Sequence, residues 1–187
     1  MSAPQRYGAG AIAIHWLHAL LVLFLIGWGL WMADLPKGPD RGWAFGIHKS
    51  FGLLAILFII ARIGWRIGHP PPPPNAALTP QENRLAGLGH LGLYGLLILV
   101  PLAGLSSVNF TKYPLKFFGL EIPKFGYPDE AINQFFSTAH QWLAYALIAL
   151  VAVHVAAAIR HGFKRDGTLE RMSPHPKKKL DTRQAEA

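Results

Sequence analysis

Histidine is the side chain in this sequence best suited to holding a metal or a metal-bearing cofactor. The chain has nine histidines and no cysteine. Disulfides, thiolate iron–sulfur clusters, cysteine zinc sites and the C-x-x-C-H attachment of haem are therefore excluded. Neutral imidazole is the main metal ligand that remains. Seven histidines lie within or at the edge of long apolar segments: His15, His18, His48, His90, His140, His154 and His161.

The composition indicates that these apolar segments cross a membrane. Of the 187 residues, 51% are hydrophobic and only 15% are charged, against about 25% charged residues in an average soluble protein. The formal charge is +8, but the basic residues gather at the ends of the apolar segments, as expected beside anionic lipid. No nucleic-acid-binding motif appears, so we expect a lipid bilayer as partner and no nucleic acid.

Four apolar segments are long enough to span a bilayer, which takes about 20 residues. They cover residues 9–33, 43–67, 85–110 and 135–159. The first and third carry no formal charge, and the charges in the second lie near its ends, from which they can reach the headgroups. The sequence therefore predicts an all-α integral membrane protein, a bundle of four transmembrane helices.

The loops set the expected topology. Residues 69–75 read HPPPPPN, which predicts an extended polyproline strut between the second and third spans. Residues 111–134 contain FFGLEIP, which we expect to lie in the membrane interface. Four spans place both termini and the proline-rich loop on one side, which carries twelve Lys and Arg against six on the other. Both termini are therefore expected in the cytoplasm. Residues 1–172 form the predicted membrane domain, and residues 173–187 a flexible basic tail.

The depth of each histidine follows from this topology. His48 and His140 lie near the outer surface, whereas His15 lies toward the cytoplasm. His154 follows His140 by 14 residues, which is about 21 Å along a helix, and just under four turns keeps both on one face. Two histidine pairs at two depths suit two stacked haems of the b type, each with two axial imidazoles.

The inner pair is open to alternatives at this point. His18 and His90 lie at the same cytoplasmic depth as His15, and either could take its place opposite His154. His161 lies about 10 Å closer to the cytoplasm than His154, where its ring could hydrogen-bond a quinone or a haem propionate.

Seven short sequences together resemble the bacterial cytochrome b561 family, which includes the cytochrome b subunits of nickel–iron hydrogenases. In chain order they are AIHWLHALLV, IHKSFG, LGHLGLY, FFGLEIP, AHQWLAY, VHVAAAIRH and DGTLERMSP. The short four-span form is most similar to the superoxide oxidase members. The resemblance implies two haem b groups with His15, His48, His140 and His154 as axial ligands. It also implies a ubiquinone site at the cytoplasmic end, with His161 matching a histidine there and Arg160 beside it.

Two redox functions are consistent with these expectations. In the first, the chain is a superoxide:ubiquinone oxidoreductase of the inner membrane, and Lys49, Lys112 and Lys116 steer superoxide toward the outer haem. In the second, it is an electron-transfer subunit that links a dehydrogenase or hydrogenase partner to the quinone pool. A haem-free protein with coincidental histidines is the third interpretation, and a visible absorption spectrum separates it from the other two.

Overall fold

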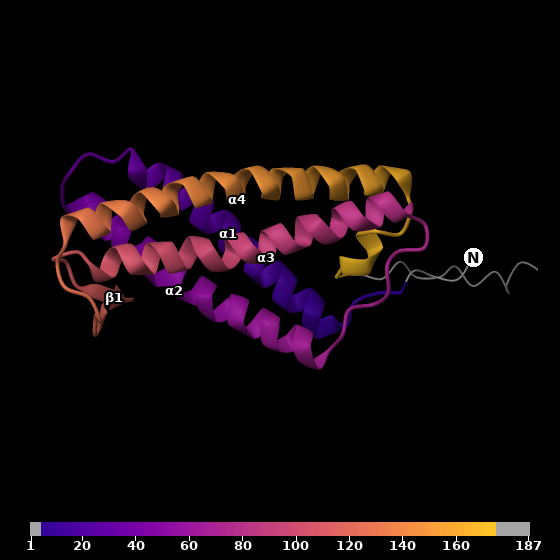
Figure 1. Ribbon diagram of the computed structural model, residues 1–187, viewed down its shortest axis with the longest axis horizontal. Coiled ribbons are helices and arrows are strands. Elements are labelled where there is room, and N and C mark those ends of the chain that lie inside the picture. Colours follow the sequence, from indigo (N-terminus) through magenta and orange to yellow (C-terminus); the bar gives the residue numbers. More distant parts are fainter. Residues whose placement is uncertain (1–4, 175–187) are drawn as a thin grey trace, which may run out of the picture.

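The computed structural model describes residues 5–174, and four long helices dominate it (Figure 1). Their bounds are Ala9–Ala33 (α1), Pro39–Gly68 (α2), Pro80–Asn109 (α3) and Glu130–Lys164 (α4). Two short strands, Leu115–Phe117 (β1) and Leu120–Ile122 (β2), and a 3-10 helix, Leu169–Met172 (η1), complete the described chain. All four helices are long and apolar enough to cross a membrane. The predicted four-helix membrane bundle is confirmed. The predicted tail, apart from its first two residues, lies outside the described part of the chain.

Three helices extend beyond the apolar spans, and polar capping residues mark the starts of two of them, α3 and α4. Thr79 caps α3, where its hydroxyl accepts from the Glu82 amide at 3.2 Å and the Glu82 carboxylate accepts from the Thr79 amide. Asp129 caps α4 by accepting from the amide of Ile132 at 2.9 Å. Both caps satisfy amides that a helix start leaves unpaired. Hydropathy locates the apolar span, whereas these polar residues decide where the helix begins.

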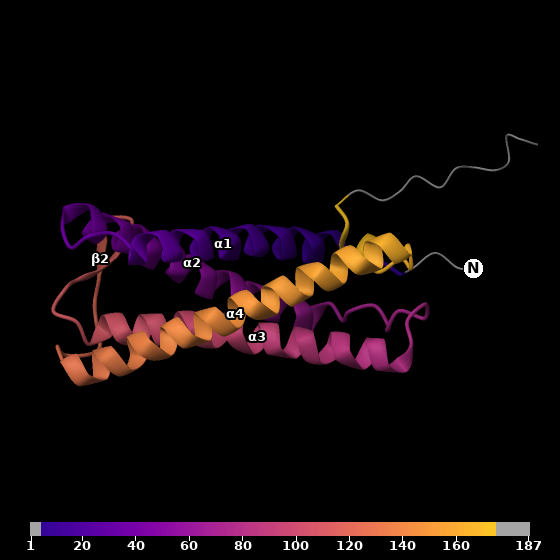
Figure 2. The same ribbon diagram turned by 90° about the horizontal axis from the view of Figure 1, so that it is seen from above.

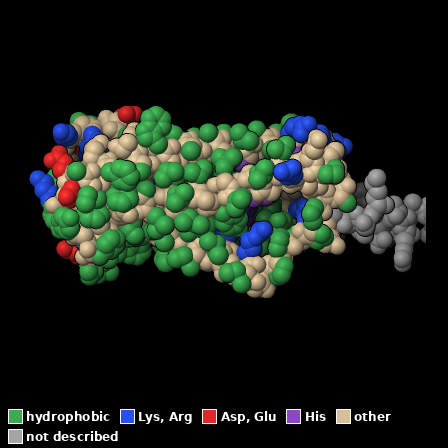
Figure 3. All heavy atoms as spheres, in the orientation of Figure 1, with side chains coloured by type: hydrophobic (Ala, Val, Ile, Leu, Met, Phe, Trp, Pro, Cys, Tyr) green, Lys and Arg blue, Asp and Glu red, His purple; other side chains and the backbone are tan. Residues whose placement is uncertain are grey.

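The helices form two hairpins. α1 packs on α2, α3 packs on α4, and α2 joins the two pairs through its contact with α3. Figure 2 shows α1 and α2 on one side of the bundle and α3 and α4 on the other, with α4 crossing obliquely. Hydrophobic side chains cover the middle of the visible surface, and charged ones gather mainly toward its two ends (Figure 3). This distribution fits a bilayer around the middle of the bundle.

The segment after α3 forms a β-hairpin at the end of the bundle opposite the proline-rich loop. We call this end the outer end, because we expect it to face the periplasm. β1 and β2 pair antiparallel, and the turn between them consists of Phe118 (φ 45°) and Gly119 (φ 96°). Two consecutive residues with positive φ are the signature of a tight hairpin turn. The Ser50 hydroxyl, buried on α2, accepts from the Phe118 amide at 2.9 Å. The FFGLEIP sequence, which we expected in the interface, therefore supplies a turn that docks on α2.

The other end of the bundle is held together by the segment around η1. Arg171 donates to the carbonyl of Pro73 at 2.6 Å, and its own carbonyl accepts from the Tyr7 amide at 3.2 Å. The Trp16 indole donates to the carbonyl of Met172 at 2.8 Å. These bonds join the beginning of the described chain, the proline-rich loop and the end of the described chain. The prediction that these three segments lie at the same end of the bundle is confirmed.

Candidate functional site

The outer histidine pair connects the two helical hairpins. His48 of α2 and His140 of α4 have ring centres 6.1 Å apart, with planes at 86°. Nδ1 of His140 lies 2.8 Å from the carbonyl oxygen of Val100. A carbonyl can only accept, so Nδ1 carries the proton and Nε2 keeps a free lone pair. Nδ1 of His48 is buried without a hydrogen-bond partner. When one nitrogen of an imidazole binds a metal, the other commonly donates a hydrogen bond, as Nδ1 of His140 does to Val100.

Two glycines leave room for the rings of His48 and His140, because a side chain at either position would crowd the ring beside it. A Cβ atom at Gly104 of α3 would lie 3.0 Å from Nδ1 of His140, and one at Gly29 of α1 would lie 3.2 Å from Cε1 of His48. Glycine inside a helix destabilises it by about 1 kcal/mol relative to alanine, so close approach of a neighbour is a physical reason for it. Sequence reasoning missed both residues, because nothing local distinguishes them from the 17 other glycines.

A cavity of about 510 Å³ lies beside the outer pair. His18, His48 and His140 line it, together with the cationic residues Arg41 and Lys49. The other lining residues are apolar or neutral, and none of the lining residues is acidic. Ligand pockets typically measure about 300–1,000 Å³ and have mostly apolar walls. The cavity therefore has the size and lining of a site for a large apolar ligand.

The inner histidine pair also connects the hairpins. His15 of α1 and His154 of α4 have ring centres 6.4 Å apart, with planes at 68°. Nδ1 of His15 is buried without a hydrogen-bond partner. α4 thus contributes one histidine at each of two depths. The structure therefore brings His15 beside His154, as the family resemblance implied, and the alternatives that depth left open have to be compared with it.

The two alternatives to His15 occupy different surroundings. The ring centre of His90 lies 5.8 Å from that of His154, but His90 belongs to α3, the helix packed against α4. Nearby, a Cβ at Gly92 would lie 3.0 Å from a methyl carbon of Leu150, so little space separates these helices. His18 is 1% exposed, neither of its ring nitrogens has a partner, and it lines the outer cavity. The tight packing of α3 on α4 beside His90, and the location of His18 at the outer cavity, both favour His15 as the partner of His154.

The separations and donor atoms fit a haem between each pair. A bond between a metal and an imidazole nitrogen is about 2 Å long, which puts the centres of two opposed imidazoles on one metal about 6 Å apart. No group of three or more His, Cys, Asp or Glu that could hold a bare ion occurs within residues 5–174. Two imidazoles alone suit a metal whose remaining ligands come from a macrocycle. His15, His48, His140 and His154 therefore fit the axial positions of two haems.

His161 forms a pair with Asp166 at the inner end of α4. Nδ1 of His161 lies 2.5 Å from a carboxylate oxygen of Asp166, and both side chains are nearly buried. Burial by itself would raise the pKa of Asp166, but hydrogen bonds from Thr168 and His161 outweigh it and hold that pKa below its ordinary value. Sequence reasoning missed Asp166. A histidine five residues from an acid across a helix end is the only local signal, and it is a weak one.

Arg160, the other inner-end candidate, lies in more open surroundings. Its side chain is 62% exposed and lies 3.7 Å from the Glu82 carboxylate, which also accepts from Lys164 at 3.1 Å. The structure thus places Arg160 on the surface and His161 in a nearly buried pair.

The predicted steering lysines differ in their surroundings. Lys49 is half-buried and lines the outer cavity, and the charges of Lys116 and Lys124 act on it. Lys124 donates to the carbonyl of Thr111. Lys112 is exposed, with its ammonium 5.6 Å from the centre of the Tyr113 ring. The structure thus gathers Lys49, Lys116 and Lys124, and it adds Arg41 at the cavity.

Comparison with known proteins gives a consistent result. The family model for prokaryotic cytochrome b561 matches residues 6–175. The chain is 34% identical to cytochrome b561 homolog 2 of Escherichia coli, over 91% of this chain and 93% of that protein. It is 27% identical to the probable superoxide oxidase CybB of Yersinia pestis, over 91% of this chain and 97% of that protein. It is also 27% identical to cytochrome b561 homolog 1 of E. coli, over 92% of this chain and 99% of that protein. With four membrane-spanning helices and a match along nearly its whole length, the chain belongs to the prokaryotic cytochrome b561 family, whose members bind haem b and transfer electrons in membranes.

Proposed function

We propose that this chain is a dihaem cytochrome b of the bacterial inner membrane that passes electrons from superoxide, on the periplasmic side, to ubiquinone. The observation that carries the proposal is the pair of histidine contacts that α4 makes with the opposite hairpin. One involves His140 and the other His154, at two depths of the same bundle. Two redox centres at two depths are what electron transfer across a membrane requires.

In this proposal the four paired histidines hold the two haems. His48 and His140 would hold the outer one, and His15 and His154 would hold the inner one. When bound, each haem would supply a one-electron iron couple. Two imidazoles on each haem would leave no position open, which suits electron transfer rather than oxygen binding. The carbonyl of Val100 holds the proton of His140 on Nδ1, so Nε2 would be the nitrogen available to a metal.

The outer end attracts the electron donor. Superoxide is a small anion, and the cavity beside His48 and His140 is lined by Arg41 and Lys49 without an acid among its lining residues. Lys116 and Lys124 add positive charge beside Lys49. A cleft lined by one sign of charge raises the local concentration of the opposite ion. Each superoxide gives up one electron and leaves as dioxygen, so two are oxidised for each quinone reduced.

The inner end supplies protons to the acceptor. Ubiquinone becomes ubiquinol by taking two electrons and two protons. Asp166 orients the His161 ring through the 2.5 Å contact between its carboxylate and Nδ1. An imidazole held by a carboxylate is a suitable general acid near neutral pH. We place the quinone head group beside His161, with Arg160 next to it.

An electron-transfer subunit is the second candidate function, and the comparisons include an observation in its favour. The relative that shares 34% identity is named only as a cytochrome b561 homolog, whereas the one named for superoxide shares 27%. Co-purification of a haem or iron–sulfur protein from native membranes would support this function. A chain that purifies alone and turns over superoxide would exclude it.

A stopped-flow experiment tests the main proposal. Purified protein is mixed with superoxide, haem reduction is followed in the visible spectrum, and ubiquinone is then added to the reduced protein. We expect reduction of both haems, followed by their reoxidation with formation of ubiquinol. A protein without b-type absorption bands, or with haems that superoxide leaves oxidised, would refute it.

The orientation has its own test. A reporter fused after residue 187 should report cytoplasm, and one inserted in residues 111–134 should report periplasm, because the basic residues favour a cytoplasmic location for the proline-rich loop and both chain ends. The opposite pattern would exchange the donor and acceptor sides.

A further inference from the structure

We propose that Arg62 and Arg66 of α2 form the binding site for the carboxylate groups of the inner haem. The inference rests on the inner haem of the proposed function. It assigns an anion site to two arginines that have no role in haem ligation or in the quinone site as proposed above.

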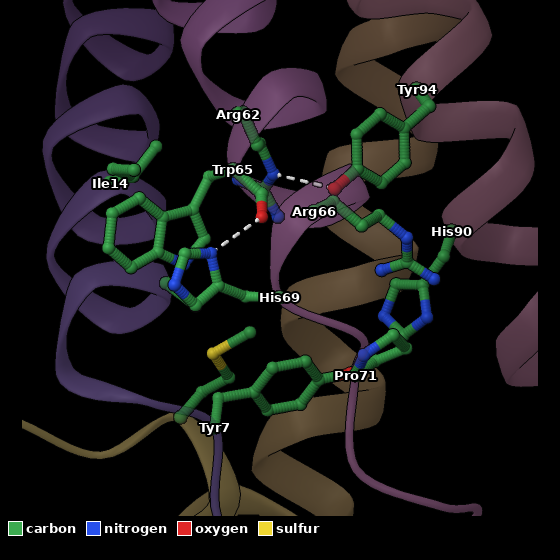
Figure 4. Close-up of a pocket in the computed structure, with 11 residues that line it drawn as sticks. Tyr7, Ile14, Arg62, Trp65, Arg66, His69, Pro71, His90 and Tyr94 are labelled. Carbon is green, nitrogen blue, oxygen red and sulfur yellow. Dashed lines mark hydrogen bonds between the residues drawn. The ribbon is translucent and has the colours of Figure 1, made fainter.

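Arg62 and Arg66 face a small pocket at the inner end of the bundle. His90 and Tyr94 of α3 and Tyr7 from the start of the described chain also line it. Figure 4 shows the Arg66 guanidinium between Tyr94 and His90, and the Arg62 guanidinium beside the Tyr94 hydroxyl on the side of Trp65. The cavity measures about 60 Å³, the space of a few water molecules. This volume suits carboxylate groups at the edge of a larger ligand and is too small for a quinone ring.

The hydrogen bonds that the described residues make in the pocket do not use the terminal guanidinium nitrogens of Arg62 and Arg66. Nε of Arg62 donates to the Tyr94 hydroxyl at 3.1 Å, and this is the hydrogen bond that the structure gives its guanidinium. Arg66 lies 5.7 Å from the centre of the Tyr94 ring, and within residues 5–174 it makes no ion pair with an acid. Tyr94 thus orients both groups without using the terminal nitrogens. Those nitrogens are the donors that bind a carboxylate in a bidentate manner.

Within residues 5–174, the structure gives the two arginines of this pocket no ion pair with an acidic side chain. The residues that line the pocket include neither Asp nor Glu. Elsewhere at this end, Glu82 pairs with Arg160 and Lys164, and Asp166 pairs with His161. Arg62 is only half-exposed and lies within a membrane-spanning helix. An unpaired charge there is costly, so an anion from outside the polypeptide would stabilise the folded protein.

The location points to the haem as the source of that anion. Arg62 is close enough to His15, His90 and His154 for its charge to act on all three. The arginines therefore lie at the depth of the inner histidine pair. Haem b carries two carboxylates on one edge, whereas a quinone is neutral. A lipid phosphate is the other anion of the same chemistry, and the experiment distinguishes the two.

The test uses the full-length haem-loaded protein in nanodiscs and compares Arg62→Gln and Arg66→Gln with Arg84→Gln. Arg84 is an exposed arginine at the start of α3 that is outside the pocket. Haem content, the midpoint potential of each haem and the redox-difference infrared spectrum are measured, with haem labelled by ¹³C at its carboxylates. Each pocket variant should lower the reduction equilibrium constant of the inner haem about tenfold, which is about 59 mV for one electron. It should also shift the labelled carboxylate bands.

The outcomes separate the possible partners. An inner-haem potential and labelled bands that match those of the Arg84 variant would overturn the inference. So would effects that appear in nanodiscs containing phosphatidylglycerol and vanish in pure phosphatidylcholine, because the headgroup of an anionic lipid, and not the haem, would then be the partner. If Arg62→Gln does not accumulate, Arg66→Gln decides alone, since Arg66 is exposed and its loss leaves the bundle intact. A wild-type protein with fewer than two haems would contradict the proposed function itself.

Discussion

The two ends of this bundle are built on different principles. The outer end encloses a cavity of about 510 Å³ with mostly apolar or neutral walls, two cationic side chains and a histidine pair. The inner end has a pocket of about 60 Å³, and it is closed by hydrogen bonds between η1, the proline-rich loop and the start of the described chain. The outer end thus provides a large space beside two cationic side chains, and the inner end provides hydrogen-bond donors held in place by neighbouring segments.

The difference follows from what each end would do. A small anionic donor needs attraction and access, which lysine and arginine around an open cavity supply. A quinone that takes up protons needs an oriented acid, and its surroundings must be held in place. The His161–Asp166 pair and the Arg171 contacts provide this at the inner end.

The largest effect should come from removing an axial ligand at one end only. We expect His140→Ala to reduce the haem content from two per chain to one and to leave the inner haem in place. The variant should also unfold at a lower temperature, because haem stabilises only the folded form. Pyridine haemochrome analysis measures the content. Trp142→Ala is the control, since Trp142 is an exposed side chain of the same helix that lines neither cavity. Two low-spin haems in His140→Ala would disprove the ligand assignment.

The next effect should be confined to the inner end. His161→Ala should slow ubiquinone reduction about a hundredfold, the usual contribution of a general acid, while both haems remain bound and reducible by superoxide. Asp166→Asn should slow it less, because the ring remains but loses its orienting carboxylate. Stopped-flow reoxidation of the reduced protein measures both rates. A His161 variant with the wild-type rate would place the quinone elsewhere.

A smaller change at the outer end should disturb one ring without removing it. In Gly104→Ala, the new Cβ would lie 3.0 Å from Nδ1 of His140, so the ring or α3 must shift. We expect a loss of about 2 kcal/mol of stability and an altered low-spin electron paramagnetic resonance signal from the outer haem alone. Gly95→Ala on the same helix is the matched control, because its Cβ would meet open space. Equal behaviour of the two variants would show that close approach at Gly104 is unimportant.

Steering should be weaker still and should depend on salt. We expect Lys49→Ala and Lys116→Ala to slow haem reduction by superoxide up to about tenfold at low ionic strength. The difference should shrink as salt screens the charges. Lys37→Ala is the control, since Lys37 is exposed in the α1–α2 loop and does not line the cavity. Rates that are independent of salt would remove the steering role.

The smallest predicted effect is the acid sensitivity of the inner end. The folded pKa of Asp166 lies below its ordinary value, so its contribution to stability is complete above that ordinary value and disappears as pH falls through the lowered one. We expect Asp166→Asn to cost about 1 kcal/mol near neutral pH. The wild type and the variant should converge in acid. Thermal unfolding followed across this pH range measures the difference, and a constant gap would contradict it.

Much of this architecture could be predicted without a structure, because membrane spans obey one-dimensional rules. Apolar length and helical rise predict the four helices and the depth of each histidine. They also predict that the start and the end of the described chain lie at the same end of the bundle as the proline-rich loop. The face shared by His140 and His154 follows from helix periodicity. A membrane forces each segment to span in a nearly fixed direction, so sequence position converts directly into depth.

Sequence position does not specify which helix faces which, and that decision belongs to the tertiary structure. Only packing shows that His15 approaches His154 from the opposite hairpin and His90 from the neighbouring helix, whereas His18 lines the outer cavity. Packing also places Gly104 against His140 and Asp166 against His161. Lateral neighbours depend on side-chain shape across the whole bundle, whereas depth depends only on distance along one helix. The sequence by itself therefore determined the levels at which chemistry occurs, and the tertiary structure determined the partners at each level.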